Sequence, residues 1–475
     1  MLFNTFSFFL FFITVFVLYW KSPNKFQWVI LLLASLYFYG SWIPAYLGLI
    51  VVTTIINYFA AIVIYRSKLY KKQILFFTIF IDLGILFLYK YLNFFSFSFG
   101  EILLNINWKI ALPQFKLLLP IGISFYTFQV VGYLVDVYRG SLKPEKHLGY
   151  FALFLCFFPQ LMSGPIERGK ELLPQLKKIH SFEYSQIISG LKLFTIGLFK
   201  KMVIADNLAV VVDRVFGSLP TYKGLSLIIT VILFTWQIYT DFSGYTDMAR
   251  GVAKMLGFNL VENFNAPYLA TSVRDFWQRW HISLSRWFRD YLYIPLGGNR
   301  GGFWRTCMNV MIVFTLCGLW HGASWTFVVW GAFHGLMMAI ERLVGKITKL
   351  QVPTVIKIIY TYSMVSISWI FFRSQNLSDA VYILRYAFVG FKSFMSVHYI
   401  LATLSQLFVT NKVEMVIVVI LLAIAIFLEI VPRISLSNFV SKQPTIIRYS
   451  LYVLLVLMII QLRDANIKQF IYVRF

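Results

Sequence analysis

Long runs of hydrophobic residues alternate with short polar or basic segments along almost the whole chain. A helix needs about 20 largely apolar residues to cross a bilayer, and many windows of the sequence meet this requirement. Some windows are short enough to form re-entrant or tilted helices. The pattern predicts an all-α, polytopic integral membrane protein with about eleven to thirteen membrane-embedded helices. The candidate spans are roughly 2–20, 26–39, 45–65, 74–89, 117–138, 149–163, 186–206, 225–240, 308–320, 325–344, 354–373, 413–431 and 447–463.

The loops between the spans indicate an orientation and a single domain. The loop RSKLYKK (66–72) carries four basic residues, and basic loops favour the cytoplasmic side, so the N-terminus is expected outside. The first span has no basic region before its apolar run and no small-residue cleavage site after it, so we expect it to be retained. No repeat period or linker divides the chain. We interpret residues 1–475 as one domain, with peripheral helices at 1–118, a motif-bearing core at 119–345 and C-terminal helices at 346–475.

Composition and charge agree with a membrane protein. The chain is 59% hydrophobic and 13% charged, against roughly 25% charged residues in an average soluble domain. The net charge of +24 comes from short basic clusters between apolar spans, which favours contact with anionic lipid over nucleic acid. The three cysteines are too few for a disulfide framework, and we expect buried thiols: Cys156, Cys307 and Cys317.

The most charged of the aromatic-rich segments is RDFWQRWHISLSRWFRDYLYIPLGG (274–298). At helical spacing it has an apolar stripe, while Asp275–Arg279 and Arg286–Asp290 share the opposite face at i,i+4 ion-pair spacing. This predicts an amphipathic interfacial helix, ended by the proline and glycines that follow. His281 lies on neither face, so its side chain is expected to point into another compartment.

A second histidine, His321, ends an apolar span in LCGLWHGASW (316–325). Gly322 and Ser324 predict a helix break and the N-cap of the next span. An intramembrane histidine is either a hydrogen-bonded core residue or a functional group. Apolar surroundings disfavour the charged ring, which leaves a neutral imidazole available as a base. His334 is interpreted as a packing or supporting histidine. No zinc-ligand spacing, nucleophile elbow or P-loop is present, so no metal site is expected.

Three further segments carry polar residues among apolar ones. The stretches 119–140 and 234–251 either line an internal tunnel or hold helices together through hydrogen bonds. The segment 158–176, FPQLMSGPIERGKELLPQL, is either a re-entrant turn near an anionic ligand or an interfacial loop. The residues expected to line a tunnel are Gln129, Gln237, Asp241, Ser285 and Ser324.

From about Leu119 onwards the chain resembles the membrane-bound O-acyltransferases, and above all their bacterial alginate O-acetyltransferase branch, which also supplies cellulose and peptidoglycan acetylation systems. The motifs that carry the resemblance are LPIGISFYTFQ, FPQLMSGPIERGKELLPQL, DFSGYTDMARG, FNAPYLATSVRDFWQRWHISLSRWFRDYLYIPLGGNR, GLWHGASWTFVVWGAFHG and the closing FIYVRF.

The resemblance implies a fold built around a tunnel, with His321 as the essential histidine and His281 as the second of a pair at its waist. It implies a bacterial inner-membrane enzyme without a permanently bound cofactor. Acetyl-CoA is the implied cytoplasmic donor, and an extracytoplasmic partner similar to SGNH hydrolases would complete transfer to a glycan. Arginine side chains suit the phosphates of CoA, although they also suit membrane anchoring; the candidates are Arg274, Arg279, Arg286, Arg289 and Arg300.

Three other functions remain open from the sequence. The D-alanyl transfer proteins of teichoic-acid modification resemble the same two histidine motifs, but their donor is an acyl-carrier protein. Acyltransferases that modify lipids or proteins resemble these motifs only weakly. A transporter or flippase would also carry polar intramembrane residues, although the chain has no detectable internal repeat.

Overall fold

The computed structural model describes residues 1–108, 113–115, 117–348, 351–408, 412–431, 440, 442–463 and 470–471. Within these residues the chain is helical apart from turns, extended connections and an isolated antiparallel bridge between Phe264 and Trp280. The all-α architecture expected from the hydrophobic pattern is therefore confirmed. The closing motif is described only at Phe470 and Ile471, and residues 472–475 lie outside the described part.

The first half of the chain contains eleven α-helices and two π-helical segments among the described residues. They are α1 (Phe6–Lys21), α2 (Asn24–Gly40), α3 (Ala45–Arg66), α4 (Lys71–Leu86), η1 (Phe87–Tyr91), α5 (Leu92–Asn105), α6 (Ile123–Tyr138), α7 (Leu148–Cys156), α8 (Phe158–Leu161), α9 (Gly169–Lys177), α10 (Tyr184–Leu198), η2 (Phe199–Ala205) and α11 (Asp206–Phe216). The segments η1 and η2 are π-helices, and each continues directly into its neighbours.

The second half contains α12, the longest single α-helix among the described residues, and continues to the C-terminal helices. Its elements are the 3-10 turn η3 (Leu219–Thr221), α12 (Leu225–Met255), the 3-10 turn η4 (Pro267–Leu269), α13 (Val273–Arg279), α14 (Ile282–Phe288), the π-helix η5 (Arg289–Tyr293), α15 (Gly302–His321), α16 (Trp325–Ile347), α17 (Thr354–Arg373), α18 (Leu377–Tyr386), the 3-10 turn η6 (Phe391–Ser393), α19 (Val397–Leu407), α20 (Lys412–Ile430) and α22 (Thr445–Leu462).

Eight helices within the described residues are long and apolar enough to cross a membrane. They are α3, the continuous α4–η1–α5, α12, α15, α16, α17, α20 and α22. The predicted spans 2–20 and 26–39 correspond to the shorter helices α1 and α2, of 16 and 17 residues. The predicted span 149–163 differs more, because α7 ends at Cys156 and only the short α8 follows. The multi-pass prediction is confirmed.

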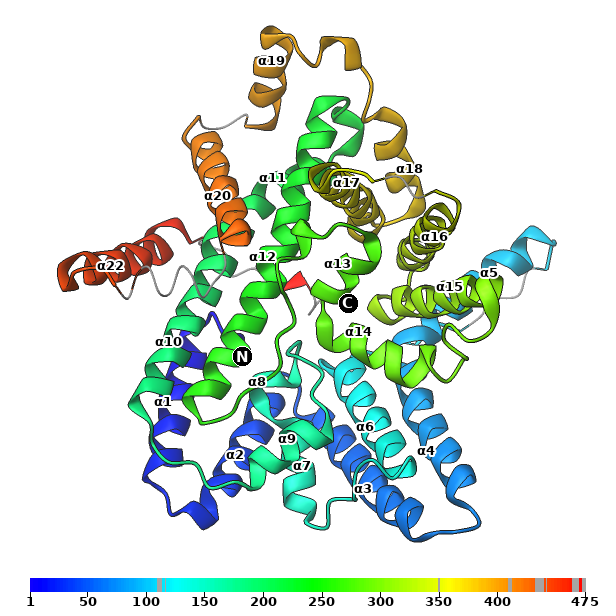
Figure 1. Ribbon diagram of the computed structural model, residues 1–475, viewed down its shortest axis with the longest axis vertical. Coiled ribbons are helices and arrows are strands. Elements are labelled where there is room, and N and C mark those ends of the chain that lie inside the picture. The colour runs from blue at the N-terminus through cyan, green and yellow to red at the C-terminus, as the bar shows by residue number, and fades with distance from the viewer. Residues whose placement is uncertain are drawn as a thin grey trace.

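Helix α12 runs diagonally through the middle of the molecule in Figure 1, with α1–α4 and α6–α9 in the lower half of the view and α16–α18 to the right of its upper part. It packs tightly against α10 because glycines of the two helices face one another. A Cβ on Gly190 would lie 2.8 Å from the backbone oxygen of Gly251, and one on Gly197 would lie 2.6 Å from that of Gly244. Small residues at such crossings allow two membrane helices to approach closely. The glycines therefore hold α12 close to α10.

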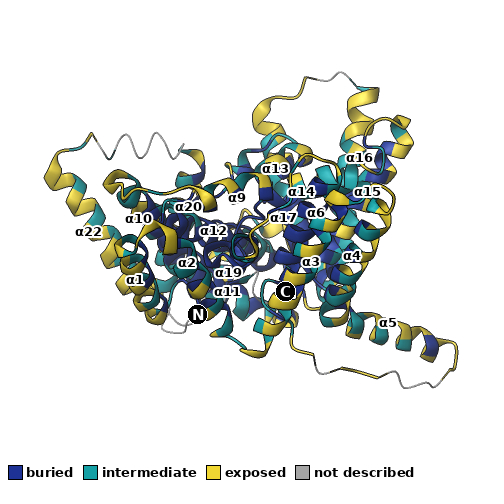
Figure 2. Ribbon diagram, turned by 90° about the horizontal axis from the view of Figure 1, so that it is seen from below, coloured by how far each residue is buried: buried dark blue, intermediate teal, exposed yellow. Residues whose placement is uncertain are grey.

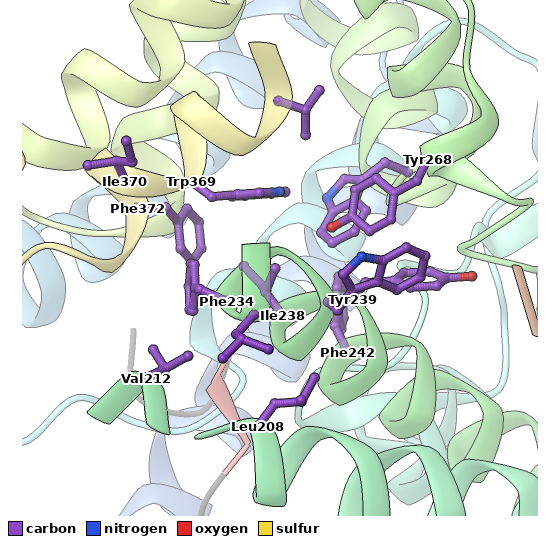
Figure 3. Close-up of a cluster of buried hydrophobic side chains, with 14 of the residues drawn as sticks. Leu208, Val212, Phe234, Ile238, Tyr239, Phe242, Tyr268, Trp369, Ile370 and Phe372 are labelled. Carbon is purple, nitrogen blue, oxygen red and sulfur yellow. The ribbon is translucent and has the colours of Figure 1, made fainter. Parts of the chain in front are cut away.

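Aromatic and aliphatic side chains fill the space between α11, α12 and α17. Figure 3 shows Leu208 and Val212 of α11 facing Phe234 and Ile238 of α12, with Trp369 of α17 above them. By contrast, the described helices α5 and α22 extend away from the buried centre (Figure 2). Their exposed apolar side chains suit contact with lipid, since hydrocarbon chains accept such surface without cost.

Candidate active site

His321 is the last residue of α15 and is almost completely buried. Its Nδ1 lies 2.7 Å from the backbone oxygen of Cys317, one turn earlier in the same helix. A carbonyl oxygen can only accept, so Nδ1 carries the proton and Nε2 is the basic nitrogen of the neutral ring. The predicted break follows as expected: Gly322 is extended, and the hydroxyl of Ser324 accepts a hydrogen bond from the Thr326 N–H at the start of α16.

His281 lies at a break in the segment that we expected to form one amphipathic helix. The single-helix prediction is wrong, because α13 ends at Arg279, Trp280 is extended and His281 adopts a left-handed conformation with φ of 42°. Asn263 stabilises the break: its backbone oxygen accepts from Ile282 N–H at 3.0 Å, and its Oδ1 accepts from Ser283 N–H at 3.1 Å. Left-handed backbone costs about 1–2 kcal/mol for a residue other than glycine, and such positions cluster at functional sites.

Trp320 brings the two histidines into one aromatic cluster. Its ring centroid lies 6.2 Å from that of His281 and 5.0 Å from that of His321. Phe242 of α12 packs against His281 at 4.8 Å, and Phe372 of α17 packs against His321 at 5.7 Å. Figure 3 shows these two phenylalanines on their respective helices. The cluster therefore surrounds both imidazoles with apolar rings that limit their hydration.

A cavity of about 930 Å³ lies on the α13–α16 side of this cluster. Its lining includes Cys317, whose backbone oxygen binds His321. Three of the five arginine candidates and one predicted tunnel residue also line it, namely Arg274, Arg286, Arg289 and Ser285. A cavity of this size accommodates a sizeable organic ligand, and the three guanidinium groups offer donors for anionic oxygens.

A second, smaller cavity has a volume of about 250 Å³. Phe372, whose ring packs against that of His321, is part of its lining. Three predicted tunnel residues line it as well, namely Gln237, Asp241 and Ser324. One contact of His321 therefore borders each cavity, Cys317 the larger and Phe372 the smaller.

The remaining candidates lie away from both cavities. Gln129 is buried and donates from Nε2 to the backbone oxygen of Phe154 at 2.8 Å, so it ties α6 to α7. Arg279 forms the predicted ion pair with Asp275, at 2.8 Å. Arg300 is exposed. These observations favour structural roles for Gln129 and Arg279 and a surface role for Arg300.

The second predicted ion pair, Arg286–Asp290, does not form. Asp290 instead accepts from Arg168 at 2.5 Å and from Arg289 at 2.6 Å. Partial burial opposes ionisation of Asp290, but the hydrogen bonds from Arg289 and Arg168 outweigh it and lower the pKa of the carboxyl group. The pair with Arg168 ties the segment 158–176, most of which is buried, to η5. Most of the segment therefore packs in the protein interior, which disfavours the interpretation as an interfacial loop, and a role near an anionic ligand stays a prediction.

The polar residues of α12 hold helices together, as one of the two interpretations expected, while the tunnel stays a prediction. Asp241 pairs with Lys201 at 2.5 Å and Asp247 with Lys200 at 2.9 Å, and all four side chains are buried. The lysines belong to the π-helix η2, so these ion pairs join two helices, while Asp241 also lines the smaller cavity. His334 is a packing histidine as expected, since its Nδ1 accepts from Trp277 Nε1 at 3.2 Å.

Two charged residues near the site were missed from the sequence. Lys90 donates to the backbone oxygens of Trp320 and His321, and Glu341 accepts from the Val273 N–H at 2.8 Å, at the start of the helix that carries Arg274. A lysine within the apolar run ILFLYKYLNFF (85–95) is itself an indication of function, but the predicted span ended at residue 89. The described residues contain no group of three or more His, Cys, Asp or Glu placed to hold a metal ion.

Comparison with known proteins shows the family of the chain. Residues 144–384 match the model of the membrane-bound O-acyltransferase family. A probable alginate O-acetylase of Pseudomonas aeruginosa is 39% identical over 386 residues, covering 80% of this chain and 73% of the relative. A peptidoglycan O-acetyltransferase of Helicobacter pylori is 37% identical over 398 residues, covering 77% and 74%. A teichoic acid D-alanyltransferase of Bacillus subtilis is 28% identical over 284 residues, covering 55% and 71%.

The matched region contains α12, both histidines and most of the residues that line the two cavities. The relatives with the higher identity cover more than two thirds of the chain. The chain therefore belongs to the membrane-bound O-acyltransferase family and is an acyltransferase.

Proposed function

We propose that the protein is an O-acetyltransferase that takes an acetyl group from acetyl-CoA on the cytoplasmic side and delivers it to a hydroxyl group of a glycan on the other side. The observation that carries the proposal is that contacts of His321 border two cavities: Cys317 lines the arginine-lined cavity, and Phe372 lines the smaller one. The two relatives named as an alginate O-acetylase and a peptidoglycan O-acetyltransferase support the acetyl group and the glycan acceptor.

In this proposal His321 is the general base. Its Nε2 removes the proton from the acceptor hydroxyl as that oxygen attacks the thioester carbonyl carbon. A C–O bond forms, the C–S bond breaks, and the departing CoA thiolate takes the proton from the imidazolium, which restores the neutral ring. The bond from Nδ1 to the oxygen of Cys317 keeps Nε2 as the basic nitrogen throughout the reaction.

His281 donates a hydrogen bond to the oxyanion or holds the acceptor in the same proposal. Its position at a helix break fixes the ring relative to Trp320 and therefore relative to His321. A donor that is positioned before the reaction and protected from water stabilises developing negative charge most effectively. The apolar rings of Phe242 and Trp320 support such a dry environment.

The larger cavity is the proposed donor site. Arg274, Arg286 and Arg289 line it, and guanidinium groups match the geometry of phosphate oxygens. The smaller cavity would receive the acceptor, with Gln237 and Ser324 offering hydrogen bonds to hydroxyl groups. A partner of the SGNH hydrolase type outside the membrane would complete the transfer to the polymer.

The central test is the substitution His321→Ala in purified protein reconstituted into liposomes. Radiolabelled acetyl-CoA and a hydroxylated oligosaccharide are supplied, and CoA release and label on the acceptor are both measured. Loss of a positioned general base lowers the rate by about 10²–10⁴-fold. His398→Ala, at an exposed position, is the matched control and should retain full activity.

Undiminished acetyl transfer by a folded His321→Ala protein would overturn the proposed mechanism. Acyl transfer from a D-alanyl carrier protein, with none from acetyl-CoA, would instead assign the chain to the activity for which the Bacillus subtilis relative is named.

A further inference from the structure

Lys90 is a charged residue within the continuous apolar helix formed by α4, η1 and α5. It belongs to η1, where the backbone widens into a π-helix. An ammonium group at membrane depth is costly unless the protein provides it with partners, and π-helical turns inside α-helices are frequent at functional sites. The position therefore requires an explanation in terms of what the ammonium group binds.

The Nζ atom of Lys90 binds the end of the helix that carries His321. It donates to the backbone oxygen of Trp320 at 2.6 Å, to that of His321 at 3.3 Å and to the hydroxyl of Ser124 at 3.2 Å. The last carbonyl groups of a helix have no partner within the helix, and they form the negative end of its dipole. A cation is the most favourable partner for this end of α15.

These contacts matter for the orientation of His321 because the chain turns away immediately after it. Gly322 is extended, so the backbone on that side does not restrain the imidazole. The ring is oriented by its bond to the Cys317 oxygen and by the direction of its own Cα–Cβ bond. Lys90 fixes the direction of this Cα–Cβ bond by holding the carbonyl groups of Trp320 and His321.

We propose that Lys90 is a positioning residue for the acyl transfer reaction, and that its ammonium group fixes the last turn of α15 so that Nε2 of His321 faces the reacting hydroxyl. This inference rests on the proposed role of His321 as the general base. Lys90 acts through the backbone of α15 and is not itself a catalytic group. Small displacements of a catalytic group reduce rates strongly, by up to about 10²-fold for 1 Å.

The alternative is a purely structural role, in which Lys90 only joins η1 to α15. Tyr91 provides the comparison, since its hydroxyl donates to the backbone oxygen of Leu319 at 3.1 Å. Tyr91→Phe removes one bond between the same two elements without changing the contacts at Trp320 and His321. A structural role predicts that Lys90 and Tyr91 variants lose activity in proportion to their loss of stability.

The experiment compares Lys90→Gln, Lys90→Arg, Tyr91→Phe and Lys72→Gln in the reconstituted acetyl-CoA assay, together with the melting temperature of each protein. Lys72 is an exposed residue of the same continuous helix and controls for the substitution itself. We expect Lys90→Gln to lower kcat at least about tenfold with KM for acetyl-CoA within about twofold. Lys90→Arg keeps the charge and should recover a substantial part of kcat, whereas Tyr91→Phe and Lys72→Gln should keep kcat within about twofold of the native value.

Native kcat in a folded Lys90→Gln protein would overturn the inference. So would losses of kcat that follow melting temperature equally in the Lys90 and Tyr91 variants, because both results assign Lys90 a structural role. If Lys90→Gln does not fold, Lys90→Arg is assessed by the same two quantities, and failure of both variants to fold also overturns the inference. A failure of the proposed function is distinguishable, since it appears as retained activity in His321→Ala whatever the behaviour of Lys90.

Discussion

At the scale of single residues, the carboxyl group of Glu167 is the clearest case in which burial sets a protonation state. It lies in the connection between α8 and α9, and its Oε1 accepts a hydrogen bond from the Val261 N–H at 2.8 Å. Burial raises the pKa of Glu167 to about 8 from its ordinary value of 4.5, against the opposing effect of that hydrogen bond. The folded protein therefore holds a proton at neutral pH that the unfolded chain releases.

This difference predicts the pH dependence of stability. The group stabilises the fold fully below about pH 4.5, and the contribution is lost as pH rises from there to about 8, where the folded state also loses the proton. Glu167→Gln mimics the neutral acid. The melting temperature is measured in detergent at pH 5 and pH 8.5. We expect it to fall less between these two pH values in the variant than in the native protein. Glu183→Gln, at an exposed position, should behave like the native protein, and identical pH profiles for all three would contradict the assignment.

Also at the residue scale, the local sequence pattern predicted the helix end at His321 but not the backbone conformation of His281. The helix end at His321, the break at Gly322 and the cap at Ser324 follow from short-range preferences, and the structure has all three. The left-handed backbone of His281 depends on Asn263, which is 18 residues away in sequence (281 − 263). A helical wheel assumes uninterrupted backbone, so it could not indicate this break or the actual partners of Asp290.

At the scale of elements, the packing of α15 against α16 sets the position of the helix end that carries His321. A Cβ on Gly331 of α16 would overlap the backbone oxygen of Phe314 on α15, and the nearest atom of Gly318 lies 3.0 Å away. Gly345, on the same helix, has no atom within 4 Å of an added Cβ. The two glycines therefore provide a matched pair for testing the crossing.

We expect Gly331→Ala to separate α15 from α16, to lower the melting temperature by several degrees, and to reduce acetyl transfer, since overpacking costs about 1–3 kcal/mol. Gly345→Ala should leave both quantities unchanged or raise stability slightly, because alanine is the better helix former. Thermal unfolding and the reconstituted assay measure the two effects. Equal behaviour of the two variants would show that the close approach does not control the site.

Elements differed from prediction mainly where helices change geometry without a change in hydrophobicity. The sequence predicted separate spans at 74–89 and 186–206, whereas α4 continues through η1 into α5, and α10 continues through η2 into α11. The π-helical segments place Lys90, Lys200 and Lys201 against their partners. Hydropathy measures how apolar a segment is, and it contains no information on where a helix widens to satisfy a buried charge.

At the scale of the whole molecule, the two cavities divide the candidate residues into those that line them and those that do not. Arg286 lines the larger cavity, whereas Arg300 of the same basic region is exposed and lies outside its lining. If this cavity receives the donor, Arg286→Gln should raise KM for acetyl-CoA about tenfold with little change in kcat, since a hydrogen bond to a charged group contributes about 1.5–3 kcal/mol. Arg300→Gln should leave KM unchanged.

Steady-state kinetics with varied acetyl-CoA in proteoliposomes separate the two parameters. An unchanged KM in Arg286→Gln, or an equal increase in Arg300→Gln, would mean that the arginines act only as membrane anchors. The same comparison decides between the two interpretations that the sequence left open for this basic cluster.

The sequence by itself determined the membrane location, the helical class, the family motifs and the two histidines, because hydropathy, capping and motif spacing act over a few residues. The tertiary structure decided which polar side chains meet: it brought Trp320 between the histidines, divided the arginines between cavity and surface, and placed Lys90 at the end of α15. The physical reason is that a buried polar group requires a partner, and in this protein the partner can come from a helix far away in sequence, as Lys90 of η1 does for the end of α15.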